Sequence, residues 1–180
     1  MRQGEHGPAE TCLRRAEETL EEGKVLRWRW HITLLHALGE LALTQERNDE
    51  AWTHASQSLE LALKSDSQKH ISRAQKLQGD ILAATGQFEG AVQTLQASIE
   101  LAERLRTPRE VWLGQAALGK VLVSFGKEKE AEEHFTQAIH TIETIAAKLL
   151  TPRLRRSFLN AAPILEVYEI LGRQPPPVAQ

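Results

Sequence analysis

One segment of the sequence has the spacing of a phosphate-binding loop. Gly114, Gly119 and Lys120 match the pattern G-x4-G-K, in which backbone amides surround phosphate groups and the lysine reaches the terminal phosphates. A complete loop continues with a serine or threonine that binds magnesium, and it follows a β-strand. Here Val121 comes next, and no strand–helix–strand pattern surrounds the segment. Nucleotide binding at 114–120 is therefore kept only as an alternative, and Gly119 has a second explanation in the repeat described below.

The histidines and the cysteine form no recognisable catalytic or metal-binding pattern. His36 and Glu40 are four residues apart, on one face of a helix, but a zinc site requires at least three ligands and no H-E-x-x-H motif is present. Cys12 is the only cysteine, so the chain has no internal disulfide and no cysteine metal cluster. We expect Cys12 to pack as a small apolar residue. The sequence predicts no catalytic residue, metal or cofactor, and hence a protein that is not an enzyme.

Charge and hydropathy narrow the class of partner. The chain has 22 basic and 24 acidic residues, a net charge of −2, which lacks the positive surplus used to bind nucleic acids or anionic membranes. No apolar run approaches the ~20 residues of a membrane span, and residues 1–8 lack the hydrophobic region of a secretory signal. We therefore expect a cytoplasmic protein that binds neither nucleic acid nor membrane.

Composition and a 40-residue repeat predict an all-α solenoid. Only 5% of residues are aromatic, β-branched residues are few, and Leu, Ala, Glu and Gln are abundant, as in packed helices. Glycines and alanines recur 40 residues apart, and a fixed period of about 20–50 residues is typical of stacked repeats. We expect these small residues to lie where paired helices approach closely. They are Gly39, Gly79, Gly119, Ala51, Ala91 and Ala131.

Apolar residues within each unit follow the i, i+3, i+4, i+7 spacing of amphipathic helices, so each unit should be a helix pair. Turn residues, including Gly86 and Gly126, separate the helices. Thr107 and Glu110 flank a proline in the arrangement of a capping box, and Thr151 precedes another proline in the same way. About eight helices are predicted: 9–22, 25–45, 49–64, 68–85, 88–106, 108–125, 128–149 and 152–171.

These helices make one repeat domain at 9–172, between a disordered tail at 1–8 and a proline-rich disordered tail at 173–180. The units are about 25–64, 68–106 and 108–149, with half-units at 9–22 and 152–172. Pro163 should kink the last helix or end it near Ala162. This helix has more apolar residues than one face can bury, which suggests self-association through it, or that the chain is the repeat region of a longer protein.

The third unit resembles the tetratricopeptide repeat, whose pattern is W-x2-L-G-x2-Y followed by alanine, an aromatic residue and alanine. The matching residues are Leu118, Gly119, Leu122, Gly126, Ala131, Phe135 and Ala138. The period of 40 exceeds the family's ~34 residues, so we expect the additional residues at the end of the second helix and in the link to the next unit. Kinesin light chains and the adaptors that orient the spindle have similarly long units. Most of residues 25–172 also resembles the C-terminal repeat regions of large bacterial signalling ATPases, nucleotide cyclases and transcription regulators. The segments that carry this resemblance are LRWRW with LLHALGELAL, LAERLRTPREVW and LRRSFLNAAPILEVYEILG.

The resemblance implies a right-handed superhelix whose first helices line a concave groove, a non-catalytic scaffold that binds a protein partner through a peptide or helix. The alternative is a regulatory or sensory segment of a larger signalling protein. The groove positions are Thr33, His36, Glu40 and Thr44, then Arg73, Lys76, Asp80 and Ala84, then Leu113, Ala116, Lys120 and Ser124. Some family members grip a terminal carboxylate with lysine and asparagine, but Asp80 stands at the asparagine place and would repel it. The same charges also fit plain solvated helix faces.

Two clusters outside the groove resemble nucleic-acid surfaces. Trp28 and Trp30 alternate with basic residues, but packing of at least one tryptophan between helices is the expectation that we retain. The arginines at 153, 155 and 156 are interpreted as a solvated helix face, because the protein as a whole is slightly acidic.

Overall fold

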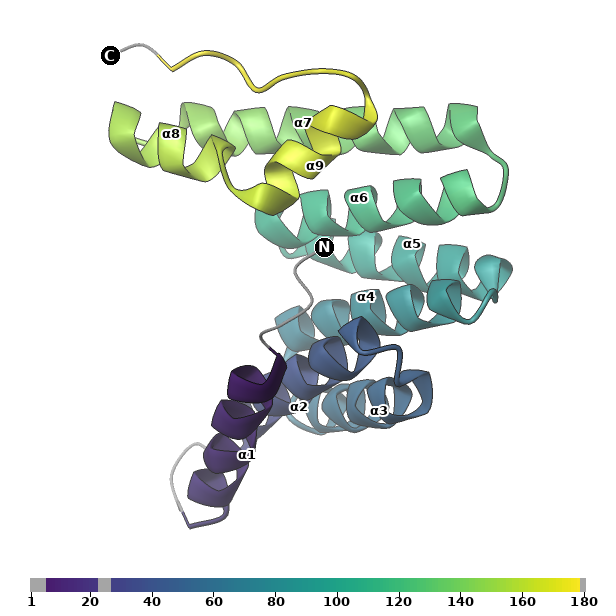
Figure 1. The fold of residues 1–180 in the computed structure, drawn as a ribbon, viewed down its shortest axis with the longest axis vertical. Coiled ribbons are helices and arrows are strands. Elements are labelled where there is room, and N and C mark those ends of the chain that lie inside the picture. Colours follow the sequence, from purple (N-terminus) through teal and green to yellow (C-terminus); the bar gives the residue numbers. More distant parts are fainter. Residues whose placement is uncertain (1–5, 23–26, 179–180) are drawn as a thin grey trace.

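The computed structural model describes residues 6–22 and 27–178. All regular secondary structure within these ranges is helical, which confirms the predicted all-α class. The helices stack in chain order from α1 at one end to α7–α9 at the other (Figure 1). They are α1 (His6–Glu22), α2 (Arg27–Thr44), α3 (Asn48–Lys64), α4 (Gln68–Ala84), α5 (Phe88–Arg104), α6 (Pro108–Ser124), α7 (Glu128–Ala147), α8 (Pro152–Leu159) and α9 (Ala162–Ile170).

The 40-residue repeat consists of two helices of equal length. The helices α3, α4, α5 and α6 each contain 17 residues, and three-residue links at 65–67, 85–87 and 105–107 separate them. In the second unit the additional residues are therefore not concentrated in the second helix and the link that follows it, as we expected, whereas in the third unit α7 has 20 residues and is longer than α6. They lengthen both helices, so each pair presents a longer packed face to its neighbours.

Each link begins with the same helix C-terminal structure. In the second unit, Gly86 has φ 76°, its N–H donates to Ala83 O, and the Gln87 N–H donates to Leu82 O at 2.8 Å. This pair of bonds is the Schellman motif, which requires a left-handed residue after the helix. Gly126 occupies the equivalent place with φ 77°, and the role predicted for both glycines is confirmed.

The predicted capping box before α6 is wrong. The Thr107 hydroxyl donates to Ala102 O at 3.1 Å, and the Thr107 N–H donates to the same oxygen, so the threonine ends α5 instead of capping α6. Glu110 is buried and faces Lys69 and Arg109. Thr151 behaves as predicted, because its hydroxyl accepts the Leu154 N–H and caps α8.

The repeated glycines lie where helices approach closely, within a unit at Gly79 and Gly119 and between the first two units at Gly39. A Cβ on Gly79 would lie 2.6 Å from Leu95 Cγ, and one on Gly119 would lie 2.8 Å from Phe135 Cε1. A Cβ on Gly39 would lie 2.9 Å from Leu77 Cδ2. The alanines at 51, 91 and 131 are at most 1% exposed. This geometry agrees with the packing role expected of the small residues.

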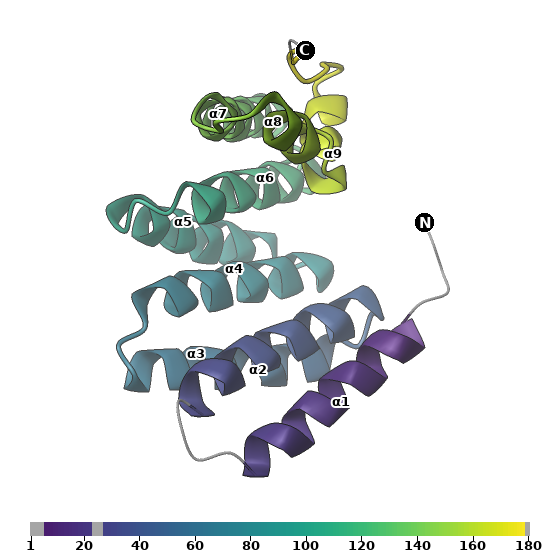
Figure 2. The same cartoon turned by 90° about the vertical axis from the view of Figure 1, so that its left-hand side faces the viewer.

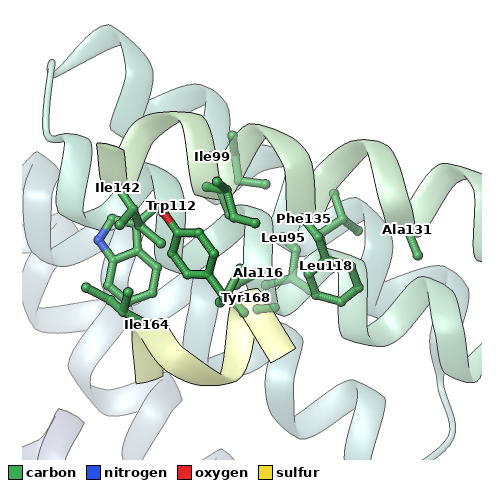
Figure 3. Packing of buried hydrophobic residues seen from close by; sticks show 14 of the residues in the cluster. Leu95, Ile99, Trp112, Ala116, Leu118, Ala131, Phe135, Ile142, Ile164 and Tyr168 are labelled. Atoms are coloured by element: carbon green, nitrogen blue, oxygen red, sulfur yellow. The ribbon is translucent and has the colours of Figure 1, made fainter. Parts of the chain in front are cut away.

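Serine hydroxyls join the paired helices at one repeated position. Ser58 of α3 donates to Ile32 O of α2, and Ser72 of α4 and Ser98 of α5 donate to each other's carbonyl oxygens at 3.0 and 2.7 Å. Forty residues further on, the third unit has Trp112 and Ala138 instead. Trp112 is 6% exposed and belongs to the main core cluster, near Ile164 and Tyr168 of α9 (Figure 3).

The predicted helix at 152–171 is two helices, α8 and α9, separated at Asn160 and Ala161. Pro163 lies in the first turn of α9, in agreement with the predicted boundary, and α9 crosses α6 and α7 (Figure 1). Tyr168 is buried, its hydroxyl donates to Glu143 of α7, and burial raises the pKa of this phenol. The turn buries much of the apolar surface that had suggested self-association, at Leu159, Ile164, Val167 and Tyr168.

The two ends differ from expectation. The first helix begins at His6, within the stretch predicted as a disordered tail, and it lies along α2 (Figure 2). Residues 173–178 have no regular secondary structure, but Val178 packs against the core cluster. Residues 1–5 and 179–180 of the predicted tails lie outside the described residues.

Several single-residue expectations are corrected. Cys12 is exposed on α1 and is not packed as a small apolar residue. Trp30 is 59% exposed and the side chain of Trp28 lies outside the described part of the chain, so packing of at least one of the two between helices stays a prediction. Arg155 is not merely solvated, since its guanidinium donates to Ala146 O and Leu149 O at the end of α7. Among the described helices, none has the length and apolar character needed to cross a lipid bilayer.

Candidate functional site

The first helices of the three units, α2, α4 and α6, lie next to one another and form one face of the stack (Figure 2). We call this surface the α2–α4–α6 face. Side chains separated by 40 residues in sequence become neighbours on it, because each unit repeats the same helix phase. Two adjoining cavities hollow the face, and positions assigned to the groove contribute to the lining of both.

The larger cavity has a volume of about 520 Å³ and lies between α4, α6 and α9. Its wall is apolar on the α6 side and is completed by two residues of the last helix. The side chains that form this wall are Trp112, Leu113, Ala116, Val121, Pro163 and Val167. Ala84 and Ser124, both assigned to the groove from the sequence, line it as well. A space of this size accommodates one or two side chains of a bound segment.

Two ion pairs flank this apolar wall. Lys76 Nζ lies 2.7 Å from Asp80 Oδ2 within α4, and Lys120 Nζ lies 2.7 Å from Glu166 Oε1 of α9. Asp80 therefore already neutralises Lys76, which agrees with our expectation that this position does not bind a terminal carboxylate. The arrangement suits a ligand whose apolar side chain is bordered by polar or charged groups.

The smaller cavity, of about 110 Å³, lies where α2, α4 and α6 meet. Its lining combines both signs of charge from three helices with the paired serines 72 and 98. The charged and titratable residues are His36, Glu40, Arg73, Lys76, Arg109 and Glu110. The two cavities share Lys76 and Leu113, so they are adjacent parts of one surface.

His36 and Glu40 form the α2 side of the smaller cavity. His36 is buried, and its Nε2 lies 3.4 Å from Glu40 Oε1, one helical turn away. The hydrogen bond from His36 lowers the pKa of the Glu40 carboxyl; burial opposes this shift, and the positive charges of Lys76 and Arg73 add to it. Glu40, whose side chain is 55% exposed, is thus held in its charged form at the surface of the α2–α4–α6 face.

Glu110 is the residue that sequence reasoning missed. Its side chain is only 5% exposed, and Oε1 is buried without a hydrogen bond; Lys69 Nζ is 3.5 Å away and Arg109 Nη1 is 3.6 Å away. The capping-box interpretation had directed this carboxylate toward Thr107. Its spacing of three and seven residues from Leu113 and Ala117 was the signal that places it on the inner face of α6.

The first unit contributes less than expected. Thr33 and Thr44 line neither cavity, and their hydroxyls donate to Arg29 O and Leu41 O within α2. His36 and Glu40 line the smaller cavity as predicted, and Leu43 reaches the larger one. The chemistry of the site is therefore concentrated on the second and third units and on α9.

The segment 114–120 is not a loop. It lies inside α6, where the backbone amides belong to the helix and cannot surround a phosphate. A Cβ on Gly114 would lie 2.7 Å from Ile99 Cγ1, so this glycine also marks a close approach between helices. Within the described part of the chain, no three His, Cys, Asp or Glu side chains are grouped as metal ligands.

No protein-family model and no curated protein sequence matches the chain. Among solved structures, the crystal structure of BtubC (BKLC) from P. vanneervenii is similar, with a TM-score of 0.67 and 14% sequence identity. The similarity covers 93% of this chain and 63% of that protein, so this chain spans less than two thirds of its length. At this identity the similarity shows a shared arrangement of helices and nothing further.

Proposed function

We propose that this protein is a non-catalytic scaffold of the tetratricopeptide-repeat type that binds a peptide or helix of a protein partner on its α2–α4–α6 face. The observation that carries the proposal is the larger cavity, an apolar wall with an ion pair on either side. Its residues come from all three repeat units, although only Leu43 comes from the first, and from α9, so a bound segment would contact several elements at once. Scaffolds of this kind recognise partners with the surface of the array.

The chemistry of the cavity defines the segment that fits it. Trp112, Leu113 and Val167 favour a large apolar side chain, whose burial contributes roughly 1.5–3 kcal/mol to binding. Lys120 and Asp80 border this wall with opposite charges and favour charged residues on either side of the apolar one. Charge complementarity at the border of an apolar contact selects among partners more than it adds affinity.

A selection from a random peptide display library on the immobilised protein tests the proposal. The affinity of the selected peptides is then measured for two variants that carry the same substitution. Ala84→Glu places a carboxylate in the larger cavity, whereas Ala97→Glu places it on the exposed side of α5. Both alanines are exposed, so neither change should unfold the chain. We expect loss of binding in Ala84→Glu alone.

A charge reversal adds a second control. Lys120→Glu should weaken the selected peptides, because it changes the charge at the border of the cavity and breaks the ion pair with Glu166. The double variant Lys120→Glu, Glu166→Lys restores an ion pair with the opposite orientation. If it recovers peptide binding, the single variant lost affinity because α9 was displaced. If it does not, the peptide recognises the charge of Lys120 itself. Equal affinity of wild type, Ala84→Glu and Ala97→Glu would refute binding at this cavity.

The position of α9 favours the sensory alternative as a second candidate. Glu166 and Val167 of this helix line the cavity, so a ligand there would touch the last helix of the chain directly. A ligand that displaces α9 would change the contacts between this helix and any neighbouring domain. Hydrogen exchange of α9, measured with and without a selected peptide, distinguishes the two: a regulatory segment should show a large change in α9, and a passive scaffold should not.

A further inference from the structure

The smaller cavity contains a positive group that is not directly paired within the described residues, although its charge acts on Glu40 at longer range. Arg73 of α4 lines it, and among the described residues its guanidinium makes no hydrogen bond and no ion pair. An arginine presents five N–H donors, arranged to hold a carboxylate through two of them. In contrast, Lys76 in the same lining is neutralised by Asp80 at 2.7 Å. Arg73 is thus the cation of this cavity that remains available.

The same cavity contains a carboxylate that is poorly paired. Glu110 of α6 is 6% exposed, and its buried Oε1 makes no hydrogen bond. Its two cations lie at 3.5 and 3.6 Å, which exceeds the ~2.7–2.9 Å of a charge-assisted hydrogen bond. A buried carboxylate without such bonds is costly, and this indicates that a donor is missing from its surroundings.

Arg73 and Glu110 do not neutralise each other. Both line the cavity of about 110 Å³, and no ion pair within the described residues joins them. A plain anion placed there would meet Glu110 and Glu40, and a plain cation would meet Arg73, Arg109 and Lys76. A small molecule that carries one charge of each sign suits this lining better than either.

We propose that the smaller cavity is a binding site for a small zwitterion of the α-amino acid class. The carboxylate lies against the Arg73 guanidinium, and the ammonium donates to Glu110 on the opposite side. Glu40, held charged by His36, adds negative potential near the ammonium. Because an enclosed cavity of about 150 Å³ accommodates benzene, a site of 110 Å³ limits the ligand to side chains of the size of glycine, alanine or serine.

This site is distinct from the apolar cavity proposed for peptide binding, although the two adjoin at Lys76 and Leu113. The variant Ala84→Glu changes only the larger cavity, so it should leave amino-acid binding intact. Failure of peptide binding and failure of amino-acid binding are therefore separate results.

Calorimetric titration of the full chain tests the inference with glycine, L-alanine and L-serine. Two probes carry half of the recognised group: N-acetyl-L-alanine keeps the carboxylate without the ammonium, and L-alaninamide keeps the ammonium without the carboxylate. We expect saturable binding of at least one amino acid and roughly tenfold or greater weakening for both half-ligands. Absence of saturable binding for all three amino acids, or equal binding of a half-ligand, overturns the proposal.

Two pairs of variants locate the site. Arg73→Gln and Glu110→Gln should each weaken binding roughly tenfold or more, because each removes one charged contact. Arg104→Gln on α5 and Glu132→Gln on α7 are exposed matched controls that should bind like wild type. Circular dichroism establishes that each variant is folded. If Glu110→Gln does not fold, Arg73→Gln and the half-ligands still decide, and wild-type affinity in folded Arg73→Gln overturns the assignment.

Discussion

Lys120 of α6 and Glu166 of α9 form an ion pair with 2.7 Å between Nζ and Oε1, across 46 residues of sequence. The pair lies beside the larger cavity and connects the third repeat unit to the last helix. Both side chains are about half exposed, at 47% and 54%. In this environment an ion pair has more influence on the position of α9 than on the stability of the fold.

The first prediction concerns the energy of this pair. Lys120→Ala, Glu166→Ala and the double variant form a thermodynamic cycle, measured by urea unfolding. We expect a coupling free energy of about 0.2–1 kcal/mol, because solvent screens half-exposed charges. A coupling well above this range would show that the pair is a main anchor of α9, and the apolar contacts of Ile164 and Tyr168 would then have a smaller part.

The second prediction compares two glycines in α4 and α5. Gly79→Ala should lower the free energy of unfolding by about 1–3 kcal/mol, because the new Cβ would lie 2.6 Å from Leu95 Cγ. Gly90→Ala is the matched control, since its Cβ would meet Leu82 Cδ1 at 3.6 Å, an ordinary contact. In that variant the higher helix propensity of alanine should raise the free energy of unfolding by up to about 1 kcal/mol. Similar effects of the two changes in urea unfolding would contradict the close helix contact at Gly79.

The third prediction concerns the links between helices. Gly126 has φ 77°, and a Cβ there would meet no atom within 4 Å, so any cost of substitution arises from the backbone alone. Gly126→Ala should lower the melting temperature, with a loss of roughly 1–2 kcal/mol, because an L-residue is disfavoured in the left-handed region. Gly126→Asn should lose less, since asparagine tolerates this conformation. Equal losses for both variants would point to a cause other than backbone conformation.

The fourth prediction is a dependence of stability on pH. His134 Nδ1–H donates a hydrogen bond at 2.6 Å to Gln115 Oε1, and burial lowers the pKa of the ring below the ordinary 6.5, although Glu133 and Glu130 act in the opposite direction. Below pH 6.5 the unfolded chain then binds more protons than the folded one. The stabilisation is complete above pH 6.5 and is lost as the pH falls through the lowered pKa.

Urea unfolding across this range measures the effect. The free energy of unfolding should decrease on acidification, and His134→Gln should reduce the slope. It should not remove the slope entirely, because burial also lowers the pKa of His70. His140→Gln, at an exposed position of the same helix, is the matched control and should keep the wild-type slope. An unchanged slope in His134→Gln would contradict the assigned cause.

Much of the candidate site was predictable from the repeat, because a period of 40 residues places equivalent positions on one face. Lys76, Asp80, Leu113 and Lys120 line the larger cavity as the family pattern implied. Glu110 was missed because a local capping motif explained it equally well, and only tertiary contacts show that α5 retains the Thr107 hydroxyl. At residues 114–120 a local pattern misled in the opposite direction. Their spacing suggested a phosphate-binding loop, but they lie within a continuous helix whose amides are not free to bind phosphate.

The sequence by itself determined the fold class and the pairing of helices within the repeat, because apolar periodicity and recurrent glycines act over a few residues along the chain. Only the tertiary structure decided what the α2–α4–α6 face contains. The break at Asn160 and Ala161 brings α9 onto the larger cavity, and Lys120 acquires Glu166 as a result. Likewise, Arg73 and Glu110 come to one small cavity although no local pattern connects them. Such contacts depend on how whole helices stack, and the energy of stacking is spread over many side chains that no short motif records.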